Sequence, residues 1–175
     1  LTKDVLDAIR ERRSIRHYQG TPIPMATITR IVEAGTRAPS AGNRQPWKFF
    51  VVLNEERRRA LAKAAFNQMF ILEAPCVIVV CAEPRRSRDR YGDRGAFLYC
   101  IQDTAAAVQN MLLAATSFGL GSCWVGAFDE REAAKALRIP YEEMRPVAMV
   151  VLGYPAERPR GPSRRPVEEV MEVIE

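Results

Sequence analysis

Histidine is nearly absent from this chain, in which His17 is the single example among 175 residues. The four cysteines, Cys76, Cys81, Cys100 and Cys123, form no C-x-x-C pair and stand in apolar surroundings. Most metal sites in proteins use histidine or closely spaced cysteine ligands, so the sequence predicts no metal site. We expect the cysteines to be buried and reduced, as is typical of cytoplasmic proteins.

Long apolar runs are also missing. No stretch reaches the roughly 18 apolar residues of a membrane-spanning helix, and no signal peptide opens the sequence. There is no P-loop, and the glycines match no dinucleotide-binding fingerprint. We therefore expect a cytoplasmic protein without membrane contact.

Charge of one sign does not dominate any long segment. The chain has 26 Lys and Arg against 21 Asp and Glu, for a net charge of +5, and arginine far outnumbers lysine. This balance favours anionic partners, but the acidic residues are interleaved with the basic ones. The sequence therefore does not indicate a nucleic-acid-binding tail.

No internal repeat is present, and apolar periodicity predicts helices that alternate with strands. The chain length fits one domain, residues 1–175. An alternation of this kind indicates an α/β fold with one sheet flanked by helices. The expected helices are 25–37, 55–65, 104–119 and 129–137, and the expected strands are 48–53, 76–82 and 146–152.

Cationic side chains gather at the end of the first predicted helix. Val5, Leu6 and Ile9 mark its apolar face, Thr2 and Asp4 its start, and the segment Arg12-Arg13-Ser14-Ile15-Arg16 follows. If the last turn persists, Arg12 and Arg16 become helical neighbours. Guanidinium groups this close suit a bidentate phosphate or carboxylate ligand. The alternative is that they complement the helix dipole and point into water.

A second basic stretch covers residues 83–95 and contains Arg85, Arg86, Arg88 and Arg90 among acidic residues. We expect a long loop, which could be a lid over a site or a solvated surface segment. As a lid, its arginines would dock an anionic small molecule.

The predicted helix 104–119 contains no charged residue, and its apolar side chains surround the axis. A helix that is apolar on every side is buried on every side. Because a domain of this size rarely encloses a helix completely, we expect an obligate homodimer in which a partner covers part of it.

Two further stretches complete a recognisable pattern. Ala38–Trp47, with its prolines and Gly42, cannot be helical, and Gly119–Ala127 ends one helix and enters a strand. Together with Arg12–Arg16, with Gly153-Tyr154-Pro155 and with Arg164-Arg165-Pro166, these stretches resemble the nitroreductase family over nearly the whole chain. The resemblance implies a mostly antiparallel central sheet and an intertwined homodimer with FMN at the subunit interface.

The resemblance also implies roles for individual residues. The arginine segment and a C-terminal arginine would hold the FMN phosphate and ribityl chain, the 38–47 loop would reach the flavin from the partner subunit, and the strand end would lie along the isoalloxazine. A C-terminal arm, residues 154–175, would wrap the other protomer. The expected cofactor-binding residues are Arg12, Arg13, Ser14, Arg16, Pro39, Ser40, Ala41, Asn43, Trp124, Val125, Gly126, Ala127, Arg164 and Arg165.

The implied activity is ping-pong reduction of nitroaromatics, quinones or related small acceptors by NAD(P)H, with the redox chemistry carried by FMN rather than by a catalytic side chain. The arginines of residues 83–95 would then dock an anionic donor or acceptor, such as the 2′-phosphate of NADPH. Charge reversal of two of them should raise KM for NADPH more than for NADH. Two features depart from better-known members: Gly126 replaces an acidic residue common in the family, and the chain is short. A specialised flavin-fragmenting or dehalogenating activity, a flavin-binding protein without turnover and a basic nucleic-acid-binding module remain as alternatives.

Overall fold

A computed structural model describes residues 3–175, and Thr2, an expected helix-start residue, lies outside this range. A four-stranded antiparallel sheet lies at the centre, in the strand order β1-β2-β4-β3. Its strands are β1 (Trp47–Val52), β2 (Cys76–Ala82), β3 (Gly121–Val125) and β4 (Arg145–Gly153). Every residue of β2 is buried, because neighbouring strands flank it and helices cover both faces of the sheet. The expected antiparallel sheet is confirmed.

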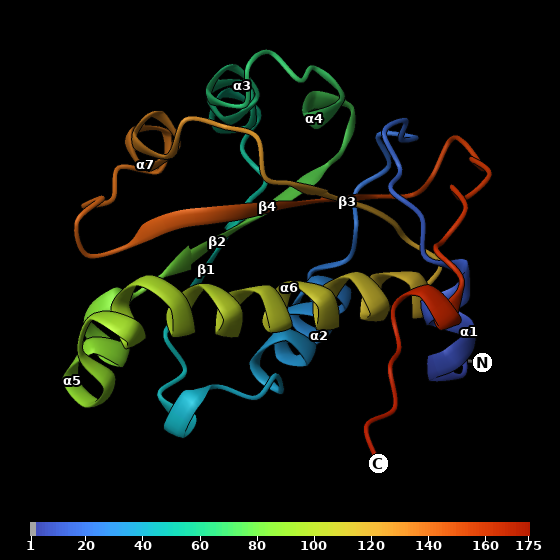
Figure 1. The fold of residues 1–175 in the computed structure, drawn as a ribbon. Helices are drawn as coiled ribbons and strands as arrows, with labels where there is room; N and C mark the ends of the chain where they lie inside the picture. Colours follow the sequence, from blue (N-terminus) through green and yellow to red (C-terminus); the bar gives the residue numbers. More distant parts are fainter. Residues whose placement is uncertain (1–2) are drawn as a thin grey trace.

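Helices form a layer on each face of this sheet (Figure 1). On one face lie α3 (Glu55–Ala64), α4 (Phe70–Glu73) and α7 (Glu130–Leu137). On the other face lie α2 (Met25–Thr36) and α6 (Cys100–Ser117). Each layer has its own apolar core, because alternate residues of the strands point to opposite faces. Asp129 caps α7 as expected, accepting a hydrogen bond of 2.9 Å from the Glu132 N–H.

Residues 83–95, expected to form a loop, are mainly helical: α5 (Pro84–Arg94) is followed by a short π-helix, η2 (Gly95–Tyr99), that runs into α6. The loop prediction is wrong because α5 has almost no apolar periodicity. Its first turn nevertheless begins with Pro84, a residue favoured at that position. The loop between α2 and β1 has the irregular course expected and contains a single short turn, η1 (Ala41–Asn43).

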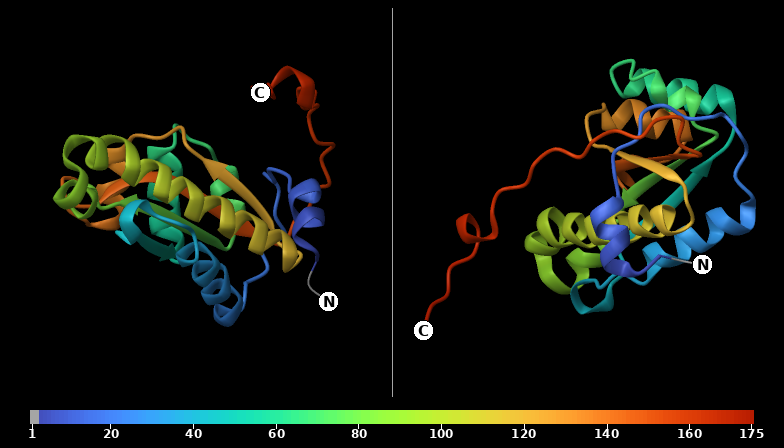
Figure 2. Two further views of the ribbon diagram at one scale, coloured as in Figure 1. Left: turned by 60° about the horizontal axis from the view of Figure 1, so that its bottom comes forward. Right: turned by 90° about the vertical axis from the view of Figure 1, so that its right-hand side faces the viewer.

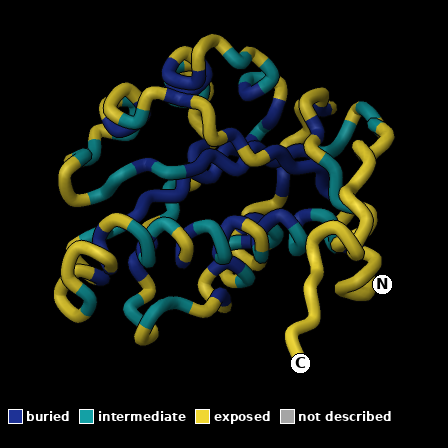
Figure 3. The backbone as a smooth tube through the Cα atoms, viewed as in Figure 1, coloured by how far each residue is buried: buried dark blue, intermediate teal, exposed yellow. Residues whose placement is uncertain are grey.

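Apolar side chains remain exposed at the edge of the molecule. In α1 (Val5–Glu11) only Ala8 is buried, so the predicted apolar face of Val5, Leu6 and Ile9 points into solvent. The C-terminal arm extends away from the sheet past α1 and carries the short turn η3 (Val167–Glu169). Figures 2 and 3 show this arm as an exposed, extended segment.

The long helix α6 is buried on one side only within this chain. Met111 and Ala115 are fully buried, whereas Ala106, Leu113 and Ala114 are half-buried. Burial on every side was expected, and the single chain does not provide it. Among residues 3–175 no helix is long and apolar enough to cross a membrane. All four cysteines are buried and free, as expected.

Candidate functional site: a cation-lined cavity

The arginine segment, Arg12–Arg16, runs as extended chain beside the edge strand β3. Helix α1 ends at Glu11, and the Ile15 N–H donates to the Ser122 carbonyl at 2.9 Å. Because side chains alternate along an extended chain, Ile15 enters the core while Ser14 and Arg16 face away from it. The predicted helical pairing of Arg12 with Arg16 is therefore wrong. The strand-like course nevertheless places their side chains on a common side.

The C-terminal arm closes a cavity of about 270 Å³ over this segment. None of the lining residues is acidic, so the cavity has a strongly positive potential and suits a phosphate group. The structure thus brings together five of the predicted cofactor residues and adds Arg160. The lining residues are Arg12, Arg13, Ser14, Arg16, Pro159, Arg160, Pro162 and Arg164.

The arginines of this cavity are not equivalent. The Arg13 guanidinium donates to the Arg10 carbonyl at 2.5 Å and to the Arg12 carbonyl at 2.9 Å, so it is engaged with the end of α1. Arg164 has longer contacts, of 3.2 and 3.3 Å, to carbonyls of its own arm. Arg165 pairs with Glu169 at 3.2 Å and does not line the cavity.

Arg160 was missed because residues 154–162 look like a proline-rich connector in the sequence. The available signal was the position of Arg160 between Pro159 and Pro162, which line the same cavity. Prolines have a fixed φ and favour extended chain, in which the side chain of an intervening residue points away from the chain axis.

Cys123 and Ser122 lie directly beneath the arginine segment. Burial raises the pKa of the Cys123 thiol, although Arg16 and Arg12 oppose that effect. The thiol is therefore neutral at physiological pH, which argues against a nucleophilic role. The buried Ser122 hydroxyl oxygen has no hydrogen-bond partner among the described residues.

The predicted flavin-facing segment Trp124–Ala127 leaves the same edge of the sheet. Trp124 is 40% exposed, whereas the Val125 side chain is buried in the core and can offer a ligand only its backbone. A Cβ atom at Gly126 would meet only the Trp124 Nε1, at 3.9 Å, so the space beside this glycine is open. This segment continues β3 from Ser122, which bridges to Ser14. The edge therefore offers an open surface next to the cavity.

The remaining predicted residues, Pro39, Ser40, Ala41 and Asn43, lie elsewhere in the chain. The Ala41 N–H donates to both Asp103 carboxylate oxygens, at 3.2 and 3.3 Å, near the start of α6. The arginine segment lies beside the other end of α6, where Arg13 and Thr116 line one hollow. Asp103 and Thr116 are about 20 Å apart along a helix. A single chain therefore does not bring the two halves of the predicted site together.

The 38–47 loop has several residues with positive φ and packs against α5. Gly42, Asn43 and Gln45 have φ values of 55°, 54° and 48°. A Cβ atom at Gly42 would lie 2.4 Å from the Tyr91 hydroxyl and 3.2 Å from the Arg90 Cδ. Burial raises the pKa of the Asp103 carboxyl, and the Ala41 N–H partly offsets this.

Most of the predicted donor-binding arginines of α5 are paired with carboxylates. Arg88 contacts Asp93 at 2.6 Å, Arg86 contacts Glu83 at 3.1 Å and Arg85 lies 3.9 Å from Glu143. Arg90 has no carboxylate partner among the described residues and lies over the Tyr91 ring. The charge density of this stretch is therefore largely balanced within the fold.

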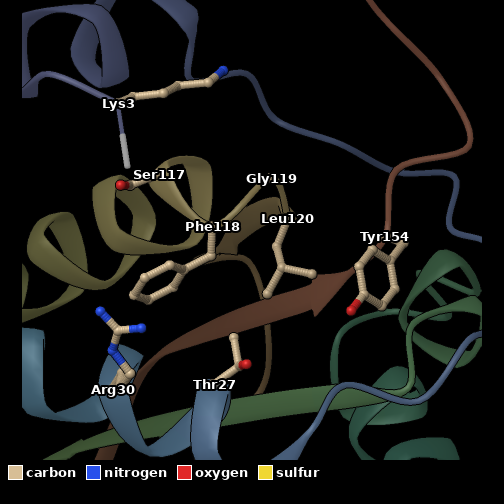
Figure 4. Close-up of a pocket in the computed structure, with 8 residues that line it drawn as sticks. All are labelled: Lys3, Thr27, Arg30, Ser117, Phe118, Gly119, Leu120 and Tyr154. Atoms are coloured by element: carbon tan, nitrogen blue, oxygen red, sulfur yellow. The ribbon is translucent and has the colours of Figure 1, made fainter. Parts of the chain in front are cut away.

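A larger hollow, of about 500 Å³, lies near the C-terminal end of α6 (Figure 4). Lys3, Arg30, Phe118 and Tyr154 are among its lining residues, and Arg30 stacks on Phe118 at 4.5 Å. None of the predicted site residues lines it. No cluster of potential metal ligands occurs within residues 3–175, and His17 contacts Glu73 at 3.2 Å outside the cation-lined cavity.

The nitroreductase family model matches residues 9–73 and 66–154, which include the arginine segment, the 38–47 loop and the end of β3. The chain belongs to the nitroreductase family. Nitroreductases are oxidoreductases, and the fold and order of motifs described above are those expected for this family. The Arg160–Arg165 part of the arm lies beyond the matched residues, so the assignment of its arginines rests on the cavity geometry.

Two curated relatives and one solved structure are similar to this nitroreductase over most of its length. A protein of Archaeoglobus fulgidus, provisionally named NADH dehydrogenase/NAD(P)H nitroreductase, is 41% identical over 89% of this chain and 87% of its own. The NADH dehydrogenase of Thermus thermophilus is 34% identical, covering 96% and 95%. A crystal structure of a Desulfovibrio desulfuricans protein in complex with FMN has a TM-score of 0.86 and 32% identity, covering 100% and 99%.

Proposed function

We propose that this protein is an FMN-dependent oxidoreductase that uses NAD(P)H to reduce nitroaromatics, quinones or related small acceptors. The observation that carries the proposal is the cation-lined cavity beside the open end of β3. A phosphate group fits the donors of the cavity, and a planar ring fits the open space at Gly126. The Desulfovibrio desulfuricans protein of the same fold was crystallised with FMN, which supports this choice of ligand.

In this proposal, Arg12, Arg16, Arg160 and Arg164 bind the phosphate and Ser14 adds a neutral donor. Arg13 fixes the end of α1, so that the cavity wall is rigid before the ligand arrives. FMN held by these residues would supply the redox chemistry between NAD(P)H and an acceptor. The side chains of this chain bind and orient, and a ping-pong order follows if donor and acceptor use the same open face in turn.

We also propose a homodimer that completes the site. The cavity and the 38–47 loop lie at opposite ends of α6, whose outer face is half-buried in a single chain. A two-fold axis across that face would place the loop of one chain beside the cavity of the other. The exposed apolar residues of α1 and of the arm, such as Val5, Ile9, Val170 and Ile174, supply further surface for such a contact.

The visible absorption spectrum of the purified protein tests the proposed function, recorded before and after anaerobic addition of NADPH or NADH. We expect flavin bands that bleach on reduction and return when a quinone or nitroaromatic acceptor is added. A colourless protein that takes up no added FMN would contradict the proposal. Bleaching by NAD(P)H without rapid turnover of simple acceptors would instead favour the specialised activities considered above.

A further inference from the structure

The C-terminal arm begins with a regular backbone pairing to the segment that follows the arginines. The Gln19 N–H donates to the Tyr154 carbonyl at 3.0 Å, and the Ala156 N–H donates to the His17 carbonyl at 2.9 Å. Tyr18 and Pro155 form an isolated antiparallel bridge. This pairing holds residues 154–156 and ends before residues 159–164, which line the cavity.

Glu157 adds a contact that depends on its own side chain. Its Oε1 accepts the Arg16 N–H at 2.5 Å and the His17 N–H at 3.2 Å. These two backbone donors lie 141 and 140 residues earlier in the chain. Hydrogen bonds to an ionised carboxylate are shorter and stronger than neutral ones, so this pair is well suited to fix two distant segments to each other.

Glu157 lies just before the part of the arm that lines the cavity, so its contact affects where that part lies. Immediately after it, Pro159, Arg160, Pro162 and Arg164 line the cation-lined cavity, whereas Glu157 itself does not. Its carboxylate therefore accepts hydrogen bonds from the backbone of Arg16 and His17 rather than pairing with the guanidinium groups. Although this acid lies close by, no cavity arginine has a carboxylate partner among the described residues, so their charge remains available to an anionic ligand.

We propose that Glu157 is the positioning residue that aligns the two halves of this cavity, holding the arm so that Arg160 and Arg164 face Arg12 and Arg16. This rests on the proposed function, in which the cavity receives the phosphate of FMN. Among the described residues, the Glu157 carboxylate accepts hydrogen bonds from the backbone of residues 16 and 17 and from no guanidinium group of the cavity, so it acts through the position of the arginines.

If Glu157 positions the arm through its carboxylate oxygen, two substitutions of Glu157 should have different effects. In Glu157→Gln the amide oxygen can still accept both N–H groups, so the arm keeps its place. Glu157→Ala removes the acceptor and frees the arm. The phosphate end of the ligand depends on the arm, and the ring end does not, so FMN and riboflavin should respond differently.

The experiment measures dissociation constants of FMN and riboflavin for the full-length apoprotein by quenching of flavin fluorescence. Glu157→Ala should weaken FMN binding by about tenfold, the loss expected for a charge-assisted contact, and leave riboflavin within about twofold. Glu157→Gln should bind both within about twofold of wild type. Glu143→Ala, an exposed acid remote from the cavity, is the matched control and should change neither.

A second measurement, amide hydrogen exchange of Arg16 and His17 in the apoprotein, does not depend on flavin. Exchange should be faster in Glu157→Ala and near wild type in Glu157→Gln. Unchanged protection in Glu157→Ala, or equal weakening of FMN and riboflavin, would overturn the positioning role. Wild-type protein that binds neither flavin would overturn the proposed function instead, and the exchange rates would still decide whether Glu157 positions the arm.

Discussion

The two ends of α6 are both rich in arginine, yet the fold uses that charge in opposite ways. At the C-terminal end, Arg12, Arg16, Arg160 and Arg164 converge on a cavity lined by no acid. At the N-terminal end, Arg86 and Arg88 of α5 pair with carboxylates of the same helix region. Like charges that lie close together repel unless an anion stabilises them, so the pairing state of the arginines, rather than their density, distinguishes the candidate site.

The strongest test of this contrast removes cations from each end. Arg12→Ala/Arg16→Ala should weaken FMN binding by about 100- to 1000-fold, because two charge-assisted contacts to the phosphate are lost. The matched pair Arg86→Ala/Arg88→Ala should leave the dissociation constant of FMN within about threefold, because these groups already have partners. Fluorescence titration measures both, and similar losses at the two ends would break the comparison.

The second prediction concerns the rigidity of the 38–47 loop. Gly42→Ala should lower the free energy of unfolding by about 2 kcal/mol, because a positive φ disfavours alanine and the Tyr91 hydroxyl occupies the space. Gly119→Ala, with φ of 75° and no atom within 4 Å of the added Cβ, isolates the backbone cost, about 1 kcal/mol. Urea unfolding measures the loss of stability in both variants. Equal losses would show that the contact with Tyr91 of α5 adds no cost at Gly42.

A third prediction concerns Arg90, which has no carboxylate partner within residues 3–175. If α5 meets an anionic donor, Arg90→Glu should raise KM for NADPH by about fivefold and KM for NADH much less, the scale of one exposed ionic contact. Arg88→Glu, which loses the contacts of Arg88 with Asp93 and with the Phe97 ring, should affect the two donors alike. Steady-state kinetics with both donors decides this, and equal changes for Arg90→Glu would remove α5 from donor selection.

The smallest expected effect is a pH dependence of the free energy of unfolding, caused by Asp103 near the N-terminal end of α6. Burial raises the pKa of Asp103 above its ordinary value of 3.8, so the native state retains a proton that the unfolded state releases. Stability should therefore fall as pH rises through the window that starts near 3.8 and ends at the raised pKa. Asp103→Asn, whose amide oxygen can still accept the Ala41 N–H, does not titrate, so its stability should not fall over this pH range. Unfolding curves across that range measure it.

Much of the fold could be predicted from local sequence patterns. The apolar run at β2, the period of α2 and the Asp129 cap each depend on neighbours close in sequence, and the structure confirms all three. The α5 helix could not be predicted, because a stretch so rich in charge has no apolar stripe to indicate it. The chain turns at Gly92, which has a φ of 56°, and α5 packs back against the start of η2, where a Cβ atom at Gly95 would lie 2.4 Å from the Ser87 carbonyl oxygen.

The candidate site was predictable in its residues more than in its assembly. Arg12, Arg16 and Arg164 were identified from their motifs and do line one cavity. Arg165 was placed there too, but it pairs with Glu169, and Arg160 takes a place in the lining. Which arginine of a proline-rich arm faces inward depends on a register set by contacts more than 100 residues away in sequence, such as that of Glu157.

The joining of residues 16–19 to residues 154–157 has a consequence for biosynthesis. A chain that emerges from the ribosome N-terminus first exposes Arg12–Arg16 long before Arg160 and Arg164 are made. Pairing across such a separation is slow to form, because loop closure costs entropy before contacts repay it. The last of the four strands ends at Gly153, so the sheet can assemble before the second wall of the cavity is made. If the cavity binds the FMN phosphate as proposed, the protein gains its cofactor only after synthesis of the C-terminal arm.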